Sequence, residues 1–175
     1  MDDIHLVDYD PRWPALYAAE SARVRAALPA GLVHAAEHFG STAIPGMVAK
    51  PVIDILIAVQ SIEQARMIAV APIVALGYAF WADKPKRDRL FFVTGLPPAA
   101  PHRTHHVHMT ELGSVMWHRL LFRDNLRAHP DEAMSYAALK RDLAARHHTD
   151  RDAYTAAKAT YVDEVMEKAD RMAAA

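Results

Sequence analysis

The residue that most strongly suggests chemistry is Asp54, an acid inside the apolar run of residues 52–59. An ionised carboxylate in a buried strand is costly unless it is paired, hydrogen-bonded or bound to a metal ion. Because side chains alternate along a strand, Asp54 should share its face with Val52 and Leu56. We interpret Asp54 as a catalytic or metal-binding candidate. The alternative is a lone carboxylate satisfied by a backbone amide or an arginine.

Two histidines, His106 and His108, occur two residues apart in a second strand candidate, and by the same alternation they share a face. Histidines at this spacing can both reach one metal ion or one phosphate. With Asp54 they would form a set of two imidazoles and one carboxylate, which suits Fe, Mn or Zn better than Mg²⁺. The spacing in the sequence does not require the three residues to meet. The alternative is that the two histidines lie on a solvent-exposed face of the sheet.

The sequence Gly40-Ser41-Thr42 ends a strand candidate and precedes a possible helix start. Backbone N–H groups exposed at such a turn can hold a phosphate. A plain turn at the end of the strand is the alternative.

Charged residues also interrupt three apolar helical stripes, at Glu20, Asp124 and Lys158. Each could lie at the edge of its stripe and extend to water. Together they favour helices that line a polar pocket. Arg123 is either the partner of Asp124 or a further pocket residue.

The elements that must position these residues follow from periodicity and capping signals. Helices are expected from about residue 11 to Pro29, over 62–76 with a kink at Pro72, over 115–129, from Pro130 onward, and after Asp150; strands are expected over 32–39, 52–59, 78–81, 89–94 and 105–109. This order predicts an α+β fold, a small mixed β-sheet flanked by helices. We expect a single domain over 1–175, with helix plus sheet in 1–112 and a helical part in 113–172.

Composition narrows the function classes. The chain has 175 residues and no cysteine, which excludes disulfide scaffolds, zinc knuckles and thiol catalysis. With 20 basic and 21 acidic residues the net charge is -1, so nucleic acid is an unlikely partner. No apolar run approaches the roughly 20 residues of a membrane span, and the acidic start is unlike a signal peptide. We expect a cytoplasmic protein with no membrane partner.

Several segments, in order, resemble the GrpB family across nearly the whole chain. They are Val7–Pro14, Glu37–Gly46, Ala49–Leu56, His106–His108, Leu121–Asp124, His129–Pro130 and Tyr154–Lys158. That family is similar in fold to the nucleotidyltransferases of the polymerase β type, and it also occurs fused to dephospho-coenzyme A kinase. The resemblance therefore implies a nucleotidyltransferase-like fold.

The superfamily pattern is a hydrophobic residue, a glycine with glycine or serine, and later a pair of acids separated by one residue. Phe39, Gly40 and Ser41, followed by Asp54, match its first part, but Leu56 occupies the place of the second acid. Two-metal phosphoryl transfer needs carboxylates that hold two cations. This departure argues against a standard centre with two Mg²⁺ ions.

The resemblance implies a protein that acts on, or binds, a nucleotide or another phosphorylated small molecule with a divalent metal, Mg or Mn before Zn or Fe. The implied catalytic and metal residues are Asp54, His106 and His108; the implied phosphate-binding residues are Gly40, Ser41, Thr42, Lys50, Arg123 and Lys158; further pocket candidates are Glu20, Glu37 and Asp124. The alternative is a non-catalytic module that binds a phosphorylated ligand on the same fold, which the loss of the second acid favours.

Overall fold

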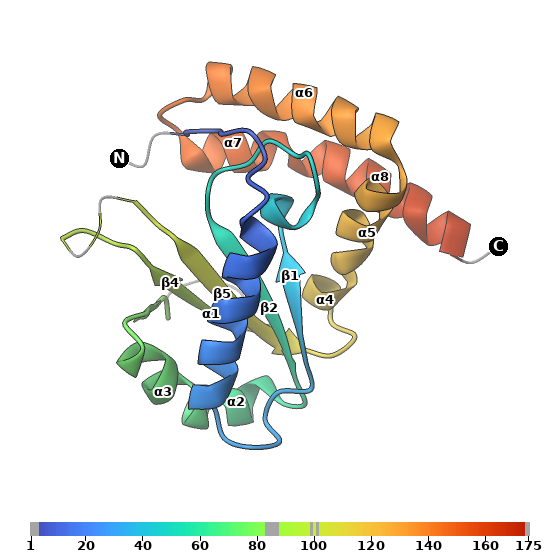
Figure 1. The fold of residues 1–175 in the computed structure, drawn as a ribbon. Helices are drawn as coiled ribbons and strands as arrows, with labels where there is room; N and C mark the ends of the chain where they lie inside the picture. The colour runs from blue at the N-terminus through green and yellow to red at the C-terminus, as the bar shows by residue number, and fades with distance from the viewer. Residues whose placement is uncertain (1–3, 83–87, 99, 101, 174–175) are drawn as a thin grey trace.

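The computed structural model describes residues 4–82, 88–98, 100 and 102–173. Its centre is a five-stranded sheet in the order β1-β2-β5-β4-β3. The strands are β1 (Ala35–Phe39), β2 (Ile53–Val59), β3 (Ala79–Phe80), β4 (Arg89–Thr94) and β5 (His105–Glu111). β2 and β5 are parallel and the other neighbours are antiparallel. The predicted mixed sheet with flanking helices, an α+β fold, is confirmed (Figure 1).

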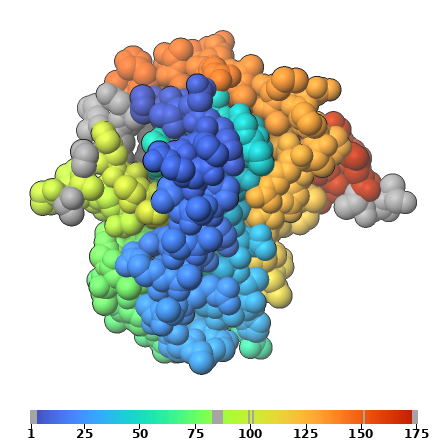
Figure 2. All heavy atoms as spheres, in the orientation of Figure 1, coloured from blue at the N-terminus to red at the C-terminus, as the bar shows by residue number. Residues whose placement is uncertain are grey.

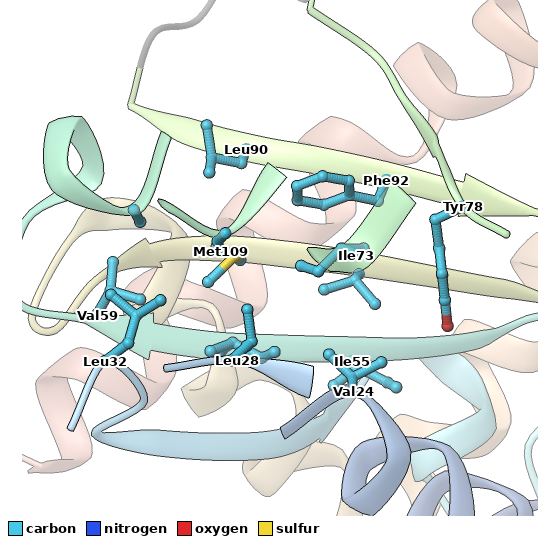
Figure 3. Close-up of a cluster of buried hydrophobic side chains, with 14 of the residues drawn as sticks. Val24, Leu28, Leu32, Ile55, Val59, Ile73, Tyr78, Leu90, Phe92 and Met109 are labelled. Atoms are coloured by element: carbon cyan, nitrogen blue, oxygen red, sulfur yellow. The ribbon is translucent and has the colours of Figure 1, made fainter. Parts of the chain in front are cut away.

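One face of the sheet carries the larger apolar core. Ile53, Ile55, Ile57 and Val59 of β2 all point into it, which confirms the alternation expected for this strand. Figure 3 shows Val24 beside Ile55 and Leu32 beside Val59, with Leu28 between these pairs. Phe92 of β4 and Met109 of β5 belong to the same cluster. The apolar half of β2 therefore anchors the strand and leaves its other face for Asp54.

Three helices cover this core: α1 (Trp13–Ala27), α2 (Ile62–Ile68) and α3 (Val70–Ala75). In the space-filling view α1 runs down the visible face (Figure 2). The side of α1 that packs on the core is narrow, since Val24 is fully buried whereas Leu16 is 47% exposed. The helix predicted over 62–76 is two helices that meet at Ala69, because Pro72 has no N–H to donate to the turn before it.

The C-terminal part is helical and covers the opposite face of the sheet. It comprises α4 (Val115–His118), α5 (Leu120–Ala128), α6 (Pro130–Arg146), α7 (Arg151–Ala157) and α8 (Ala159–Ala173). The helix predicted over 115–129 is interrupted at Arg119, and the helix after Asp150 is interrupted at Lys158. Two smaller apolar clusters join these helices to Leu56 and to the loop around Met47.

Within the described residues, none of the helices combines the length and apolar character that crossing a bilayer requires.

Candidate metal and ligand site

Asp54, His106 and His108 meet on the sheet face that lies toward the C-terminal helices. The parallel register of β2 and β5 places Asp54 beside His106 and Leu56 beside His108, so that all three polar side chains share one face. Asp54 Oδ1 lies 2.8 Å from His106 Nδ1 and 3.6 Å from His108 Nε2. Each of the three residues offers a donor atom within 4.8 Å of the other two. The pairing of β2 with β5 therefore brings together three residues whose separation the sequence alone did not determine.

The protonation states of this cluster suit a metal ion. Burial alone would raise the pKa of Asp54, but the hydrogen bond from His106 and the nearby His108 outweigh it and hold that pKa well below its usual range. Burial lowers the pKa of His108, and the attraction of Asp54 offsets this only in part. An ionised carboxylate thus faces a neutral imidazole at neutral pH, and these are the forms that bind metals.

The second ring nitrogen of each histidine, the one that does not face Asp54, is a further place where an ion or ligand could bind. His106 Nε2 and His108 Nδ1 are buried and have no hydrogen-bond partner among the described residues. A buried polar atom without a partner costs about 1–3 kcal/mol and calls for a bound water, ion or ligand atom. Two imidazoles and one carboxylate match Mn, Fe or Zn in donor chemistry. The three residues could therefore bind a metal ion.

Gly40 makes the close approach of the turn to Asp54 possible. Its φ is 71°, and a Cβ at this position would lie 2.5 Å from Asp54 Oδ2. Directly after it, a single 3₁₀ turn (Ser41–Ala43) buries Thr42, whose hydroxyl donates to the Val52 carbonyl and lies 3.1 Å from His38 Nε2. The turn that was predicted to hold phosphate therefore lies directly beside the Asp54 carboxylate.

A cavity of about 580 Å³ opens above the cluster, between the sheet and the C-terminal helices. Nine predicted residues line it: Gly40, Ser41, Thr42, Lys50, Asp54, His106, His108, Arg123 and Lys158. These come from the strands, the 3₁₀ turn and the helices, so the fold brings far-apart segments together at one place.

Glu20 does not reach this cavity. α1 packs its apolar side on the other face of the sheet, and there the Glu20 carboxylate accepts hydrogen bonds from Arg23 and from the Tyr78 hydroxyl, at 2.5 and 2.6 Å. Glu20 lies on the apolar stripe because it joins this local network. The pattern of α1 alone could not predict the contact with Tyr78, which comes from another segment.

Glu37 and Asp124 lie outside the cavity lining and hold Arg123 in place. The buried guanidinium donates to Glu37 at 2.7 Å, to Asp124 at 2.8 Å and to the backbone carbonyl of His38 at 2.8 Å. Its donors are thus engaged in joining α5 to β1. Arg127 reinforces this joint by donating to the carbonyl of Ala43 at the end of the 3₁₀ turn.

Comparison with known proteins agrees with this architecture. The sequence profile described as GrpB protein matches residues 3–168. The chain belongs to the GrpB family. It is 46% identical to a UPF0157 protein of Pseudomonas aeruginosa over 96% of this chain and 68% of that protein.

Two further GrpB-related proteins are informative. The crystal structure of the conserved protein GrpB from Enterococcus faecalis superimposes with a TM-score of 0.85 at 28% identity, covering 98% of this chain and 100% of the other. A dephospho-CoA kinase of Mycolicibacterium paratuberculosis is 37% identical over 89% of this chain but only 43% of its own length. The family resemblance expected from the sequence is confirmed.

Lys140 and Tyr154 are among the lining residues of the cavity that sequence reasoning missed. Lys140 is 2% exposed, and its ammonium group donates to the Val48 carbonyl. Burial, together with the nearby Lys158 and Lys50, lowers the pKa of Lys140 to about 7. A signal was available, because Lys140 continues the buried stripe of Tyr136 at helical spacing.

Proposed function

We propose that this protein binds one divalent transition-metal ion and a nucleotide, or a nucleotide-derived phosphorylated ligand, in the cavity and transfers a nucleotidyl group. The observation that supports it is the convergence of Asp54, His106 and His108 within 4.8 Å on the floor of that cavity. Perturbed, buried ionisable groups in a cleft are characteristic of functional sites.

The charge of the cavity supports an anionic ligand. Among the described residues, six basic side chains line it (Lys50, Arg103, Arg119, Arg123, Lys140 and Lys158) against three acidic ones (Asp54, Asp152 and Asp163). The whole chain carries a net charge of -1, so the basic excess is local. A cleft lined by one sign of charge raises the local concentration of ligands of the opposite sign.

Each residue of the floor has a role in this proposal. Asp54, His106 and His108 would hold the ion, which when bound supplies positive charge beside a phosphoryl oxygen. Gly40 and Ser41 would orient the phosphate next to it. In the transfer, an acceptor oxygen bonds to the α-phosphorus of a nucleoside triphosphate. The bond to the bridging oxygen breaks, pyrophosphate leaves, and the acceptor proton passes to solvent.

Isothermal titration with ATP, CTP and dephospho-coenzyme A, with and without Mn²⁺ or Mg²⁺, tests this function. The coenzyme precursor is included because one relative is named dephospho-CoA kinase. We expect Mn²⁺-dependent nucleotide binding, which Asp54→Ala weakens at least a hundredfold. Asp8→Ala removes a carboxylate whose side chain is 95% exposed and should change nothing. Equal binding by wild type and Asp54→Ala contradicts the assignment.

A binding module without catalysis is the second candidate, and Leu56 favours it. This residue is fully buried against Met116 and Leu120 at the position where a second acid would ligate another cation. Pyrophosphate release across a broad screen of acceptors separates the two candidates. Nucleotide binding that requires Asp54 but yields no pyrophosphate with any acceptor selects the module.

A further inference from the structure

A buried tyrosine lies between two lysines at the helical side of the cavity. Tyr154 of α7 has no exposed surface, and the Nζ atoms of Lys158 and Lys50 lie 4.2 and 5.4 Å from its ring centroid. Ammonium groups are attracted by the face of an aromatic ring, so Tyr154 holds both lysine side chains against itself. Their source segments, the loop before β2 and the end of α7, are about a hundred residues apart in the chain.

The hydroxyl of Tyr154 and the amine of Lys140 complete this cluster. The hydroxyl is buried and has no hydrogen-bond partner among the described residues. The Nζ atom of Lys140 lies 5.4 Å from the ring centroid of Tyr136, and the charges of Lys50 and Lys158 act on it. Lys50, Lys140, Lys158 and Tyr154 all line the same cavity, in which basic side chains outnumber acidic ones. Such a local excess of positive charge favours a bound anion.

We propose that Lys50, Lys140, Lys158 and Tyr154 form a subsite for a chain of two or three phosphate groups. The lysines are compact point charges that suit phosphate oxygens, and the tyrosine hydroxyl offers one further donor. This inference builds on the proposed function, because it places the di- or triphosphate part of the ligand in the same cavity. It differs in its residues, none of which is a candidate metal ligand.

A phosphate chain fits this cluster better than a single phosphate. Three ammonium groups come from three separate segments: Lys50 from the loop before β2, Lys140 from α6 and Lys158 from the α7–α8 junction. A single phosphate carries at most about two negative charges near neutral pH, whereas triphosphate carries more and spreads them along its length.

Isothermal titration of the full chain with sodium triphosphate, pyrophosphate and orthophosphate tests the subsite in buffer that contains EDTA. Without metal, the result does not depend on Asp54, His106 and His108. We expect triphosphate to bind at least tenfold more tightly than orthophosphate, with pyrophosphate between them. Lys158→Gln and Tyr154→Phe should each weaken triphosphate binding, the former at least tenfold.

Matched controls make the outcome decisive. Lys168→Gln removes a half-exposed lysine of α8 that pairs with Glu132 and should leave binding within twofold of wild type. The folding of Lys140→Met is checked first by circular dichroism. If this variant does not fold, Lys158→Gln alone tests the contribution of the lysines. Equal affinity for the three anions, absence of triphosphate binding, or equal losses in Lys168→Gln and Lys158→Gln would each overturn the subsite.

The same experiment separates this inference from the proposed function. Asp54→Ala should keep its metal-free triphosphate affinity within threefold of wild type while losing Mn²⁺-dependent nucleotide binding. If triphosphate binding depends on the lysines but Mn²⁺ has no effect on nucleotide binding, the proposed function is wrong and the subsite is supported. Metal binding without triphosphate binding would do the opposite.

Discussion

At the scale of single residues, a side chain at position 40 would force the Asp54 carboxylate to move. We expect Gly40→Ala to push that carboxylate away from both imidazoles and to lower Mn²⁺ affinity at least tenfold, because the new Cβ would lie 2.5 Å from Asp54 Oδ2. The free energy of unfolding should fall by about 1–3 kcal/mol. Metal titration and chemical denaturation measure both effects.

Gly113→Ala provides the control for backbone strain alone. Gly113 has a φ of +79°, but a Cβ there would meet nothing within 4 Å. This variant should cost about 1 kcal/mol of stability through its positive φ and leave Mn²⁺ affinity within twofold. If Gly40→Ala binds Mn²⁺ as wild type does, the close approach has no bearing on the metal site.

Lys140 makes a testable contribution to the pH dependence of stability. Its pKa is about 7 in the folded chain against 10.5 for an ordinary lysine, so the unfolded chain binds more protons between these values. The free energy of unfolding therefore rises with pH in this window, by roughly 3–5 kcal/mol from this residue. Denaturation of wild type and Lys140→Met at pH 7 and pH 10.5 should show the gain in wild type only. Parallel curves for the two proteins would contradict the lowered pKa of Lys140.

How much of the site could be predicted depends on the range of the interaction. The alternation of side chains along a strand predicted that Asp54 and Ile53 lie on opposite faces of the sheet. It also predicted that His106 and His108 share one face, because both relations are local in sequence. The contact of Asp54 with His106 arises from the parallel pairing of β2 with β5, between residues 52 positions apart, which no local pattern encodes. The ligands were therefore predictable one strand at a time, but their meeting was not.

At the scale of elements, helical periodicity predicted where helices lie but not where they break. The apolar spacing continues from Tyr154 to Tyr161, yet the helix is interrupted at Lys158. As a result Tyr154 faces the cavity, while the ring of Tyr161 stacks on that of Tyr136 with 5.4 Å between the centroids. Such breaks depend on the surfaces against which each half packs. Pro72 is the exception, because proline marks its own break in the sequence.

The joint between α5 and β1 should depend on Arg123. Its buried guanidinium binds Glu37, Asp124 and the His38 carbonyl, and removing it leaves these acceptors without their donor. We expect Arg123→Met to lower the free energy of unfolding by about 2–4 kcal/mol in chemical denaturation. A double-mutant cycle with Glu37→Gln should give a coupling of about 1 kcal/mol or more.

Arg141→Met serves as the matched control for this joint. Arg141 is well exposed and its pair with Asp8 spans 3.5 Å, so its loss should change stability by no more than about 0.5 kcal/mol. Equal effects of Arg123→Met and Arg141→Met would show that the interactions of Arg123 with β1 contribute little.

At the scale of the whole molecule, the two proposed subsites belong to different layers. The candidate metal ligands stand on β2 and β5, whereas Lys140 and Lys158 belong to the helices above them (Figure 1). A ligand that binds one subsite should protect the layer that carries it. In hydrogen-exchange measurements we expect Mn²⁺ alone to slow exchange mainly in β2 and β5, and metal-free triphosphate to slow it mainly in α6 and α7.

The size of this protection follows from mass action. Triphosphate at 100 times its dissociation constant should raise the free energy of unfolding by about 2.7 kcal/mol, because it binds only the folded chain. A nucleoside triphosphate that binds both subsites with Mn²⁺ should protect β2, β5, α6 and α7 together. If that ligand protects one layer only, the metal cluster and the lysine cluster do not bind the same molecule, and the cavity holds two separate sites.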